Sequence, residues 1–275
     1  ALEKGKEVDR LTLKTIISIK RSNLSVDNQL NYDLFRRNAE MTVEKQHFPG
    51  EYLVINQMEG LPRDVPSMIE MMSRSNLNDY KTILSRLSGV SDLVDQTIVL
   101  LQEGLVRGIV PPKIPLRTLA DQVLGQIHED AFASPMLTHF KSFPETVSLI
   151  DQARLKKTAE NVYLSEVKPA LNRLHVYLRD EYVPKCRDSV GRSALPNGLK
   201  WYDYMIRHYT TTSLTPDKIH EIGLIEVKRI REEMEAIKEE VGFNEGLIDF
   251  FKFLRTDSRF YYETADELLA GYRDI

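Results

Sequence analysis

The dipeptide His220-Glu221 is the part of this sequence that most resembles a zinc-binding motif. In the motif HExxH, two histidines one helical turn apart bind the metal and the glutamate activates a water molecule. The second histidine would have to be residue 224, and that residue is Leu224. The spacing therefore predicts no zinc site here. We interpret His220 first as an ordinary helix residue and second as a residue that lines a site.

Two other residues are candidate nucleophiles. Ser193 lies in the sequence Gly-Arg-Ser-Ala-Leu, where Leu195 replaces the second glycine of the G-x-S-x-G turn found in serine hydrolases. Cys186 is the single cysteine, so the chain can form no internal disulfide. Its neighbours Lys185 and Arg187 have the charge that lowers a thiol pKa, but no histidine is placed beside it as a base. We predict neither residue to be catalytic.

The remaining histidines are scattered along the chain. None has a partner histidine or carboxylate at a spacing that would place both on one helical face as a ligand set. These histidines are His47, His128, His139, His175 and His208. The sequence therefore predicts no metal-binding residues, no catalytic residues and no cofactor held by this chain alone.

The densest group of hydrogen-bonding side chains runs from Trp201 to Ser213 and contains several tyrosines and threonines. One interpretation is structural, because buried tyrosines anchor helices and hydroxyl residues cap the next helix. The other is that phenol, imidazole and hydroxyl groups line a peptide cleft. The structural interpretation is favoured for any single residue. The candidate substrate-binding residues are Tyr202, His208, Thr211 and His220.

A long helix is predicted to follow this group. Thr215 can cap its N-terminus, Pro216 fits the first helical position, and Gly242 supplies the stop. The apolar residues at spacings of three and four predict that one face packs and the other is in water. This apolar stripe consists of Ile219, Val227, Ile230, Met234, Ile237 and Val241. On the polar face, the pairs Lys228/Glu232 and Arg231/Glu235 should contribute roughly 0.2–0.5 kcal/mol each.

The rest of the chain predicts a mainly α, multi-helix fold. Further helices are expected over residues 7–20, after caps at Ser25 and Asn76, from about Ser91 to Leu105, and over residues 116–127 and 247–254. A short strand or extended segment is expected near residues 48–58, where the helical period is lost between Pro49-Gly50 and Gly60.

Proline and glycine predict the other breaks. Residues 131–144 should form a packed loop, and residues 145–182 form the longest periodic run, which Pro169 should kink or divide into two helices. Thr264 and Glu267 form a capping box for a last helix. That helix has no stop signal, so we expect Ile275 to be a cut and not a natural terminus.

Composition excludes some functional classes. Charged residues make up 28% and hydrophobic residues 42% of the 275 residues, which is typical of a soluble globular protein. A net charge of −4 gives no electrostatic reason to expect nucleic acid as a partner. The apolar runs fall far short of the ~20 residues needed to cross a bilayer, so no transmembrane segment is predicted.

Several linked stretches resemble the bacterial domain-of-unknown-function family 885, from about Leu30 to the end of the chain. They are FPGEYLVINQMEG, VPPKI, DSVGRSALPNG, HYTTTSLTPDKIHEIGLIEVKRIREEM and LRTDSRFYYETADELLAGYR. The resemblance implies a helical zinc peptidase of the HExxH type whose metal motif lies downstream of this sequence. It also implies that residues 1–275 are one mostly helical region, the N-terminal half of that protein.

Several expectations follow from this resemblance. The missing C-terminal half should be a partner, a peptide the substrate and zinc the cofactor of the intact protein, whereas this fragment alone should be inactive. A cut chain should also expose an apolar face near its C-terminal helices and self-associate. The alternative is a non-catalytic helical binding or envelope lipoprotein. Localisation stays open between an exported envelope lipoprotein and a cytoplasmic protein.

Overall fold

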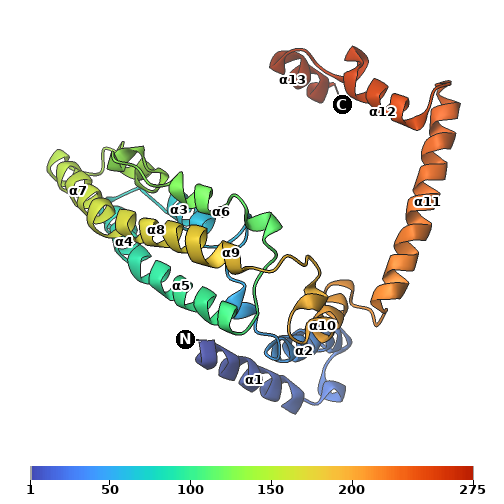
Figure 1. Ribbon diagram of the computed structural model, residues 1–275, viewed down its shortest axis with the longest axis horizontal. Coiled ribbons are helices and arrows are strands. Elements are labelled where there is room, and N and C mark those ends of the chain that lie inside the picture. Colours follow the sequence, from blue (N-terminus) through green and yellow to red (C-terminus); the bar gives the residue numbers. More distant parts are fainter. Residues whose placement is uncertain (1, 275) are drawn as a thin grey trace. The chain divides into compact units, whose positions relative to one another are not determined.

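The structure, a computed structural model, describes residues 2–274 and is mainly helical (Figure 1), as the sequence predicts. The chain forms two compact units, Ala1–Met205 and Ile206–Ile275. The first unit contains α1 (Leu2–Ser18), α2 (Val26–Lys45), α3 (Leu61–Met71), α4 (Leu77–Ser88), α5 (Val90–Val106), α6 (Leu119–Leu124), α7 (Leu149–Val162), α8 (Lys168–Tyr177) and α9 (Val183–Lys185). Helix α10 (Gly198–Thr210) leads into the second unit, which contains α11 (Pro216–Glu240), α12 (Leu247–Thr256) and α13 (Ala265–Arg273).

The main core of the first unit lies between two rows of helices. Helix α4 packs on α7, α5 packs on α8, and α6 covers α8, as Figure 1 shows. The connection over residues 131–144 is packed, as predicted, because its 3-10 turn over Pro135–Phe140 carries three fully buried apolar side chains, Met136, Leu137 and Phe140. Phe140 and Phe143 lie with their ring centres 5.6 and 4.7 Å from that of Tyr80 on α4.

Helices α7, α8 and α9 follow one another with π-helical turns between them. These turns are Tyr163–Val167 and Leu178–Tyr182, where Lys168 N–H donates to Tyr163 O and Val183 N–H donates to Leu178 O. Pro169 and Pro184 each lie two residues beyond a turn. A proline has no N–H and its ring displaces the carbonyl four residues earlier, so a wider turn accommodates both without ending the helix. The predicted break at Pro169 is therefore a π turn.

The first π turn also positions a buried tyrosine. The Tyr163 side chain is fully buried, its hydroxyl donates to Gln126 O at 3.1 Å, and it accepts from His128 N–H at 2.9 Å. One hydroxyl thus satisfies two backbone groups where α6 ends. By contrast, the buried hydroxyls of Tyr177 and Tyr182, near and within the second π turn, have no hydrogen-bond partner.

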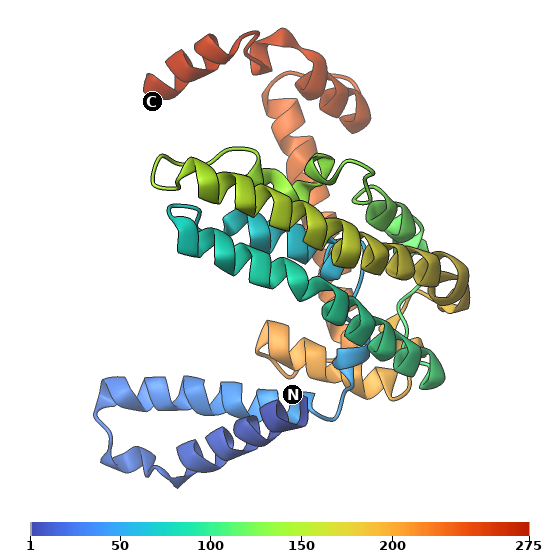
Figure 2. The same ribbon diagram turned by 90° about the vertical axis from the view of Figure 1, so that its left-hand side faces the viewer.

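A second, smaller core joins α2 and α10. It contains Met41, Ile109, Leu195, Trp201 and Tyr204. The Tyr204 hydroxyl donates to Met41 O at 3.1 Å, and the Trp201 ring stacks on Phe48 with ring centres 5.7 Å apart. The other end of α2 forms an antiparallel hairpin with α1, drawn in blue in Figure 2. Helix α1 has no buried residue, and α2 buries only Tyr32, Ala39 and Met41.

The segment near residues 48–58 is not a strand. It forms a 3-10 turn over Gly50–Tyr52 and then an irregular connection that buries Ile55. Among the described residues the only β-type pairing is one isolated bridge, between Pro112 and Arg187. The extended alternative is therefore the correct one, because no neighbouring segment is available to form a ladder with these residues. The helix predicted over residues 116–127 is also shorter than expected, since only Leu119–Leu124 is α-helical.

The second unit begins with α11, whose ends follow the predicted signals. The Thr215 hydroxyl accepts from Lys218 N–H at 3.2 Å. At the other end, Gly242 has φ 73°, its N–H donates to Glu239 O, and Phe243 N–H donates to Lys238 O, which is a Schellman motif. The predicted capping box of Thr264 and Glu267 is also present at α13.

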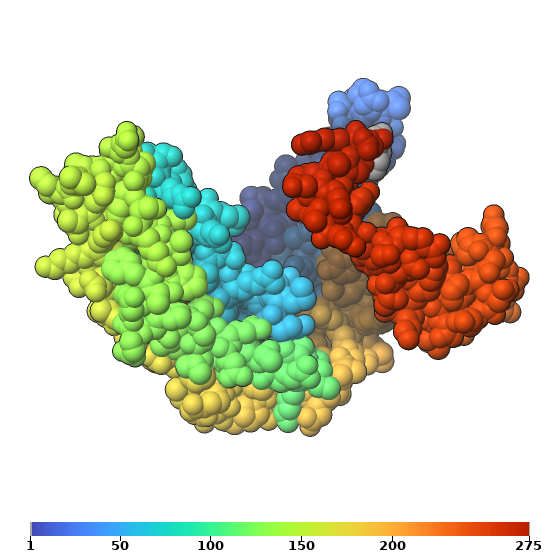
Figure 3. Space-filling view, turned by 90° about the horizontal axis from the view of Figure 1, so that it is seen from above, coloured from blue at the N-terminus to red at the C-terminus, as the bar shows by residue number. Residues whose placement is uncertain are grey.

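The packing predicted for α11 is wrong for the described chain, since this helix has no buried residue. Helix α12 meets it only near its C-terminal end, where Phe243 packs on Phe250 and Phe253. Figure 3 shows the surface of these two helices, coloured orange to red. The ion pair Lys228–Glu232 forms at 3.8 Å, whereas Glu235 contacts Lys238 at 3.0 Å.

The two kinds of buried tyrosine hydroxyl predict effects of different size when the hydroxyl is removed. Tyr163→Phe should lower the free energy of unfolding by about 1–3 kcal/mol, because Gln126 O and His128 N–H lose their partner. Tyr182→Phe, the matched control, should change it by less than about 0.5 kcal/mol, because its hydroxyl has no partner to lose. Urea unfolding followed by circular dichroism measures both, and equal losses would contradict the hydrogen-bond assignment.

Two glycines at the ends of helices also predict opposite effects. Gly60, before α3, has φ 108°, and a Cβ there would lie 2.8 Å from Val54 O, so Gly60→Ala should destabilise by more than about 1 kcal/mol. Gly89, between α4 and α5, has φ −79° with its nearest neighbour at 3.4 Å. Gly89→Ala should therefore stabilise by about 0.4–1 kcal/mol. Thermal unfolding tests the pair, and a loss of stability in both would contradict this account.

Candidate functional site

The four predicted substrate-binding residues are exposed. Tyr202 is on the exposed side of α10, in the first unit. In the second unit, the His208 ring packs edge-on against Tyr209 with ring centres 4.9 Å apart. Thr211 follows α10 in a left-handed conformation with φ 57°, and His220 is exposed on α11. Their role in substrate binding stays a prediction.

The other residues of the aromatic and hydroxyl group have structural roles. Trp201 and Tyr204 are buried in the second core, and Arg192 lies over the Trp201 ring at 4.7 Å. The Thr210 hydroxyl donates to Ile206 O at 2.8 Å, and Thr212 N–H donates to the Thr210 hydroxyl, which ends α10. For these residues the packing and capping interpretation is the correct one.

The histidines and carboxylates were tested as ligands for the zinc ion that the sequence resemblance implies. Within residues 2–274, no group of three or more His, Cys, Asp and Glu side chains lies close enough to hold a metal ion. Glu221, beside His220, contacts Lys218 at 2.7 Å. His139 and His175 are buried and bond to backbone carbonyls, Ile69 O at 2.8 Å and Ala120 O at 2.9 Å. These described residues do not fit a zinc ion.

Cys186 is buried directly after α9, with only 3% of its surface exposed. Burial raises the pKa of its thiol to about 12, and the charges of Lys113 and Arg187 oppose this only in part. The effect of burial on this pKa is thus larger than that of the neighbouring cations. The thiol lies beside Tyr182, and burial also raises the pKa of that phenol. A protonated, enclosed thiol is not a nucleophile.

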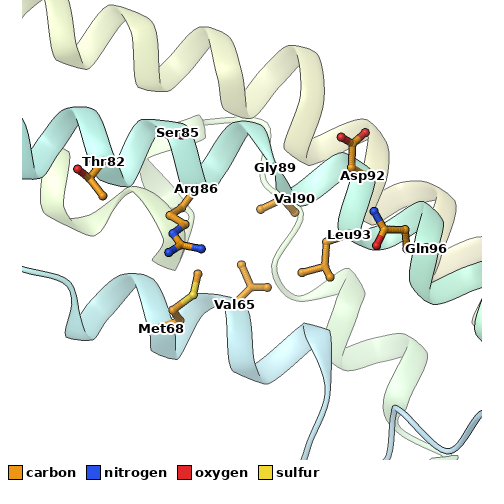
Figure 4. Close-up of a pocket in the computed structure, with 10 residues that line it drawn as sticks. All are labelled: Val65, Met68, Thr82, Ser85, Arg86, Gly89, Val90, Asp92, Leu93 and Gln96. Atoms are coloured by element: carbon orange, nitrogen blue, oxygen red, sulfur yellow. The ribbon is translucent and has the colours of Figure 1, made fainter. Parts of the chain in front are cut away.

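One cavity is a groove of about 610 Å³ formed by α3, α4 and α5 (Figure 4). Its apolar surface comes from Val65 and Met68 on α3 and from Val90 and Leu93 on α5. Val65 and Val90 are buried, whereas Met68 and Leu93 are exposed. Gly89 joins α4 to α5 at the edge of the groove.

One cation faces this apolar surface. The Arg86 side chain extends from α4 toward Met68 on α3, whereas the Asp92 carboxylate points away from the groove (Figure 4). No described carboxylate forms an ion pair with Arg86. The lining of the groove contains no nucleophile paired with a base, and its residues suit an apolar group with an anionic neighbour. The sequence analysis missed it, because its residues come from three helices and share no motif.

A second cavity, of about 600 Å³, lies within the second unit where α11 meets α12. Its walls are apolar and aromatic, with Ile237 and Val241 from α11 and Phe250 and Phe253 from α12. Arg259 lies over the Phe253 ring at 5.0 Å and is paired with Asp257 at 2.9 Å. This site resembles an incomplete core more than a catalytic site. None of the predicted substrate-binding residues lines either cavity.

None of the described helices is both long and apolar enough to span a bilayer.

Comparisons with known proteins give a family match and a structure of similar fold. The sequence model of a family described as "Bacterial protein of unknown function (DUF885)" matches residues 1–275. The crystal structure of the putative lipoprotein from Colwellia psychrerythraea is similar, with a TM-score of 0.86 at 20% sequence identity. The match covers 99% of this chain and 50% of that chain, so this chain spans about half the length of the Colwellia protein. At this identity the similarity shows the fold alone. No curated protein matches the sequence.

Proposed function

We propose that this chain, which belongs to the DUF885 family of bacterial proteins of unknown function, is the N-terminal helical part of a zinc-metallopeptidase-like protein. In this proposal the chain lines a peptide cleft, and the HExxH metal site lies in a part of the protein downstream of residue 275. The chain alone would be inactive. The observation that carries the proposal is that the chain matches the family over residues 1–275 and yet spans about half the length of a structure with the same fold.

The buried polar groups and the cavity walls of the two units support a role as a scaffold and not as a catalytic centre. In the first unit the buried side chains of Tyr163, His139 and His175 bond to backbone carbonyls. Its groove and the cavity of the second unit offer apolar surface without a nucleophile and base pair. Residues with these properties can hold a peptide in place while another part of the protein acts on it.

The substrate-binding role belongs to the exposed polar side chains around the end of α10. Tyr202, His208, Thr211 and His220 offer hydroxyl and imidazole groups that can bond to a peptide backbone. The left-handed conformation of Thr211 is uncommon for a β-branched residue, and such conformations often accompany function. We assign these residues to positioning of the substrate.

A second candidate function is that of a non-catalytic helical binding protein of the cell envelope. Two observations favour it. The Colwellia protein is described as a putative lipoprotein, and the α1–α2 hairpin exposes large apolar side chains to a partner. These side chains include Leu11, Val26, Leu30, Leu34 and Phe35. An envelope location is compatible with either candidate function.

Metal analysis separates the two candidates. The longer family protein that contains this chain should bind about one zinc ion and hydrolyse peptides in a chelator-sensitive way. The isolated chain should bind no stoichiometric zinc and hydrolyse nothing. Elemental analysis after dialysis, together with a peptide-hydrolysis assay, measures both. Tightly bound zinc in the isolated chain, or a longer protein without zinc and without activity, would contradict the peptidase proposal.

Variants of the surface residues test the assigned positioning role. In the longer protein, Tyr202→Phe and His208→Gln should raise KM for a peptide by roughly threefold to tenfold each, because each removes a hydrogen-bonding group. Zinc content and kcat should change little. Tyr209→Phe, on the neighbouring exposed tyrosine, is the control. If both variants match this control, the two residues do not bind the substrate.

A further inference from the structure

The exposed face of α11 has the residue pattern of a coiled coil from Glu226 to Val241. In a heptad repeat, positions a and d carry the apolar residues that meet the partner helix, and e and g flank them. Here position a is occupied by Val227, Met234 and Val241, and position d by Ile230 and Ile237. All five side chains are exposed, between 38% and 66%, and Ile237 and Val241 also line the cavity beside α12. Figure 1 shows α11 as a straight helix that meets α12 only at its C-terminal end.

The charges beside this stripe indicate which partner fits. Every g position is glutamate, at Glu226, Glu233 and Glu240, and the e positions between them are Arg231 and Lys238. In a parallel pair of helices, g of one copy faces e of the next heptad on the other. Two copies of α11 would therefore bring Glu226 opposite Arg231, and Glu233 opposite Lys238, on both sides of the stripe.

An antiparallel pair of the same helices is disfavoured. In that arrangement g faces g and e faces e, so glutamates would face glutamates and cations would face cations. Like charges in such positions destabilise the pairing. The pattern is therefore self-complementary in one direction only.

The ion pairs within α11 do not include Arg231. Arg229, at position c, contacts Glu226 at 2.9 Å and Glu233 at 2.7 Å, and Lys238 contacts Glu235 at 3.0 Å. The Arg229 pairs are at the helix surface, where exchange of partners costs little, whereas the Lys238 side chain is only 12% exposed. Arg231 forms no ion pair with any described carboxylate, so an opposing Glu226 would give it one.

We propose that α11 is a self-association surface, through which two or more copies of this chain pair in parallel along the stripe from Glu226 to Val241. Apolar burial at the a and d positions drives the pairing, and the g and e charges set its direction. The inference is independent of the peptidase proposal, because it concerns this face of α11 and no catalytic residue.

Sedimentation velocity of the 275-residue chain tests the proposal. The native chain should associate as its concentration rises through about 10–100 μM, a range typical of modest interfaces. Ile230→Glu should abolish association, because it places a charge at a central d position. Ile222→Glu is the matched control, since Ile222 is on the same helix with the same exposure of 41% but lies off the stripe. A monomeric native chain, or equal behaviour of the two variants, would overturn the proposal.

A charge exchange tests the direction of pairing. Glu226→Arg should weaken association by about tenfold, because it faces Arg231 in a parallel pair. The double variant Glu226→Arg/Arg231→Glu should restore it. Glu232→Lys, at an outward f position, should leave association unchanged. Circular dichroism of each variant verifies that α11 remains helical, and failure of the double variant to restore association would overturn the parallel arrangement.

Cross-linking gives an independent result. Val227→Cys should form a disulfide between copies under mild oxidation, because like a positions meet only in a parallel pair. Glu232→Cys, on the outward face, should form much less of this dimer. The native Cys186 is buried and gives the background. Equal cross-linking of the two variants would count against the proposal.

Discussion

The first unit depends on the long helical segment of residues 149–185, which contains two prolines and packs in the apolar core. Between residues 149 and 185 the chain must bury one face completely while Pro169 and Pro184 each remove a backbone donor. A π turn before each proline meets both demands, because the wider turn tolerates the ring and returns the chain to the same axis. The fully buried side chains that α5 and α6 contact include Val167, Leu171, Leu174 and Leu178. If a π turn ended the helix, these side chains would no longer lie on one face of a continuous helical segment.

Local signals in the sequence predicted the ends of helices well. The caps at Ser25, Asn76, Thr215 and Thr264 are all present, because a cap depends on a few adjacent residues whose chemistry is visible in the sequence. The effect of Pro169 was predicted only as a kink or division. The π turn depends on the helix being held from both sides, and that information lies in α5 and α6.

Properties that depend on distant segments were predicted poorly. The stripe on α11 was predicted correctly as a pattern, but whether it is buried depends on a partner that periodicity does not reveal. The candidate site was sought where polar residues are dense in the sequence, around Tyr202 and His208. The groove beside Arg86 combines α3, α4 and α5, and its residues become neighbours only in the fold. The incomplete motif at His220 is visible in the sequence itself, since Leu224 occupies the position of the second histidine.

The burial of Cys186 makes the single thiol a natural reporter of motion in the first unit. A reagent that modifies thiols can reach it only when the segment around the second π turn opens, because the side chain is enclosed and held protonated. The rate of modification therefore measures how often this part of the core opens. The second unit contains no cysteine, so its fluctuations do not contribute to the signal.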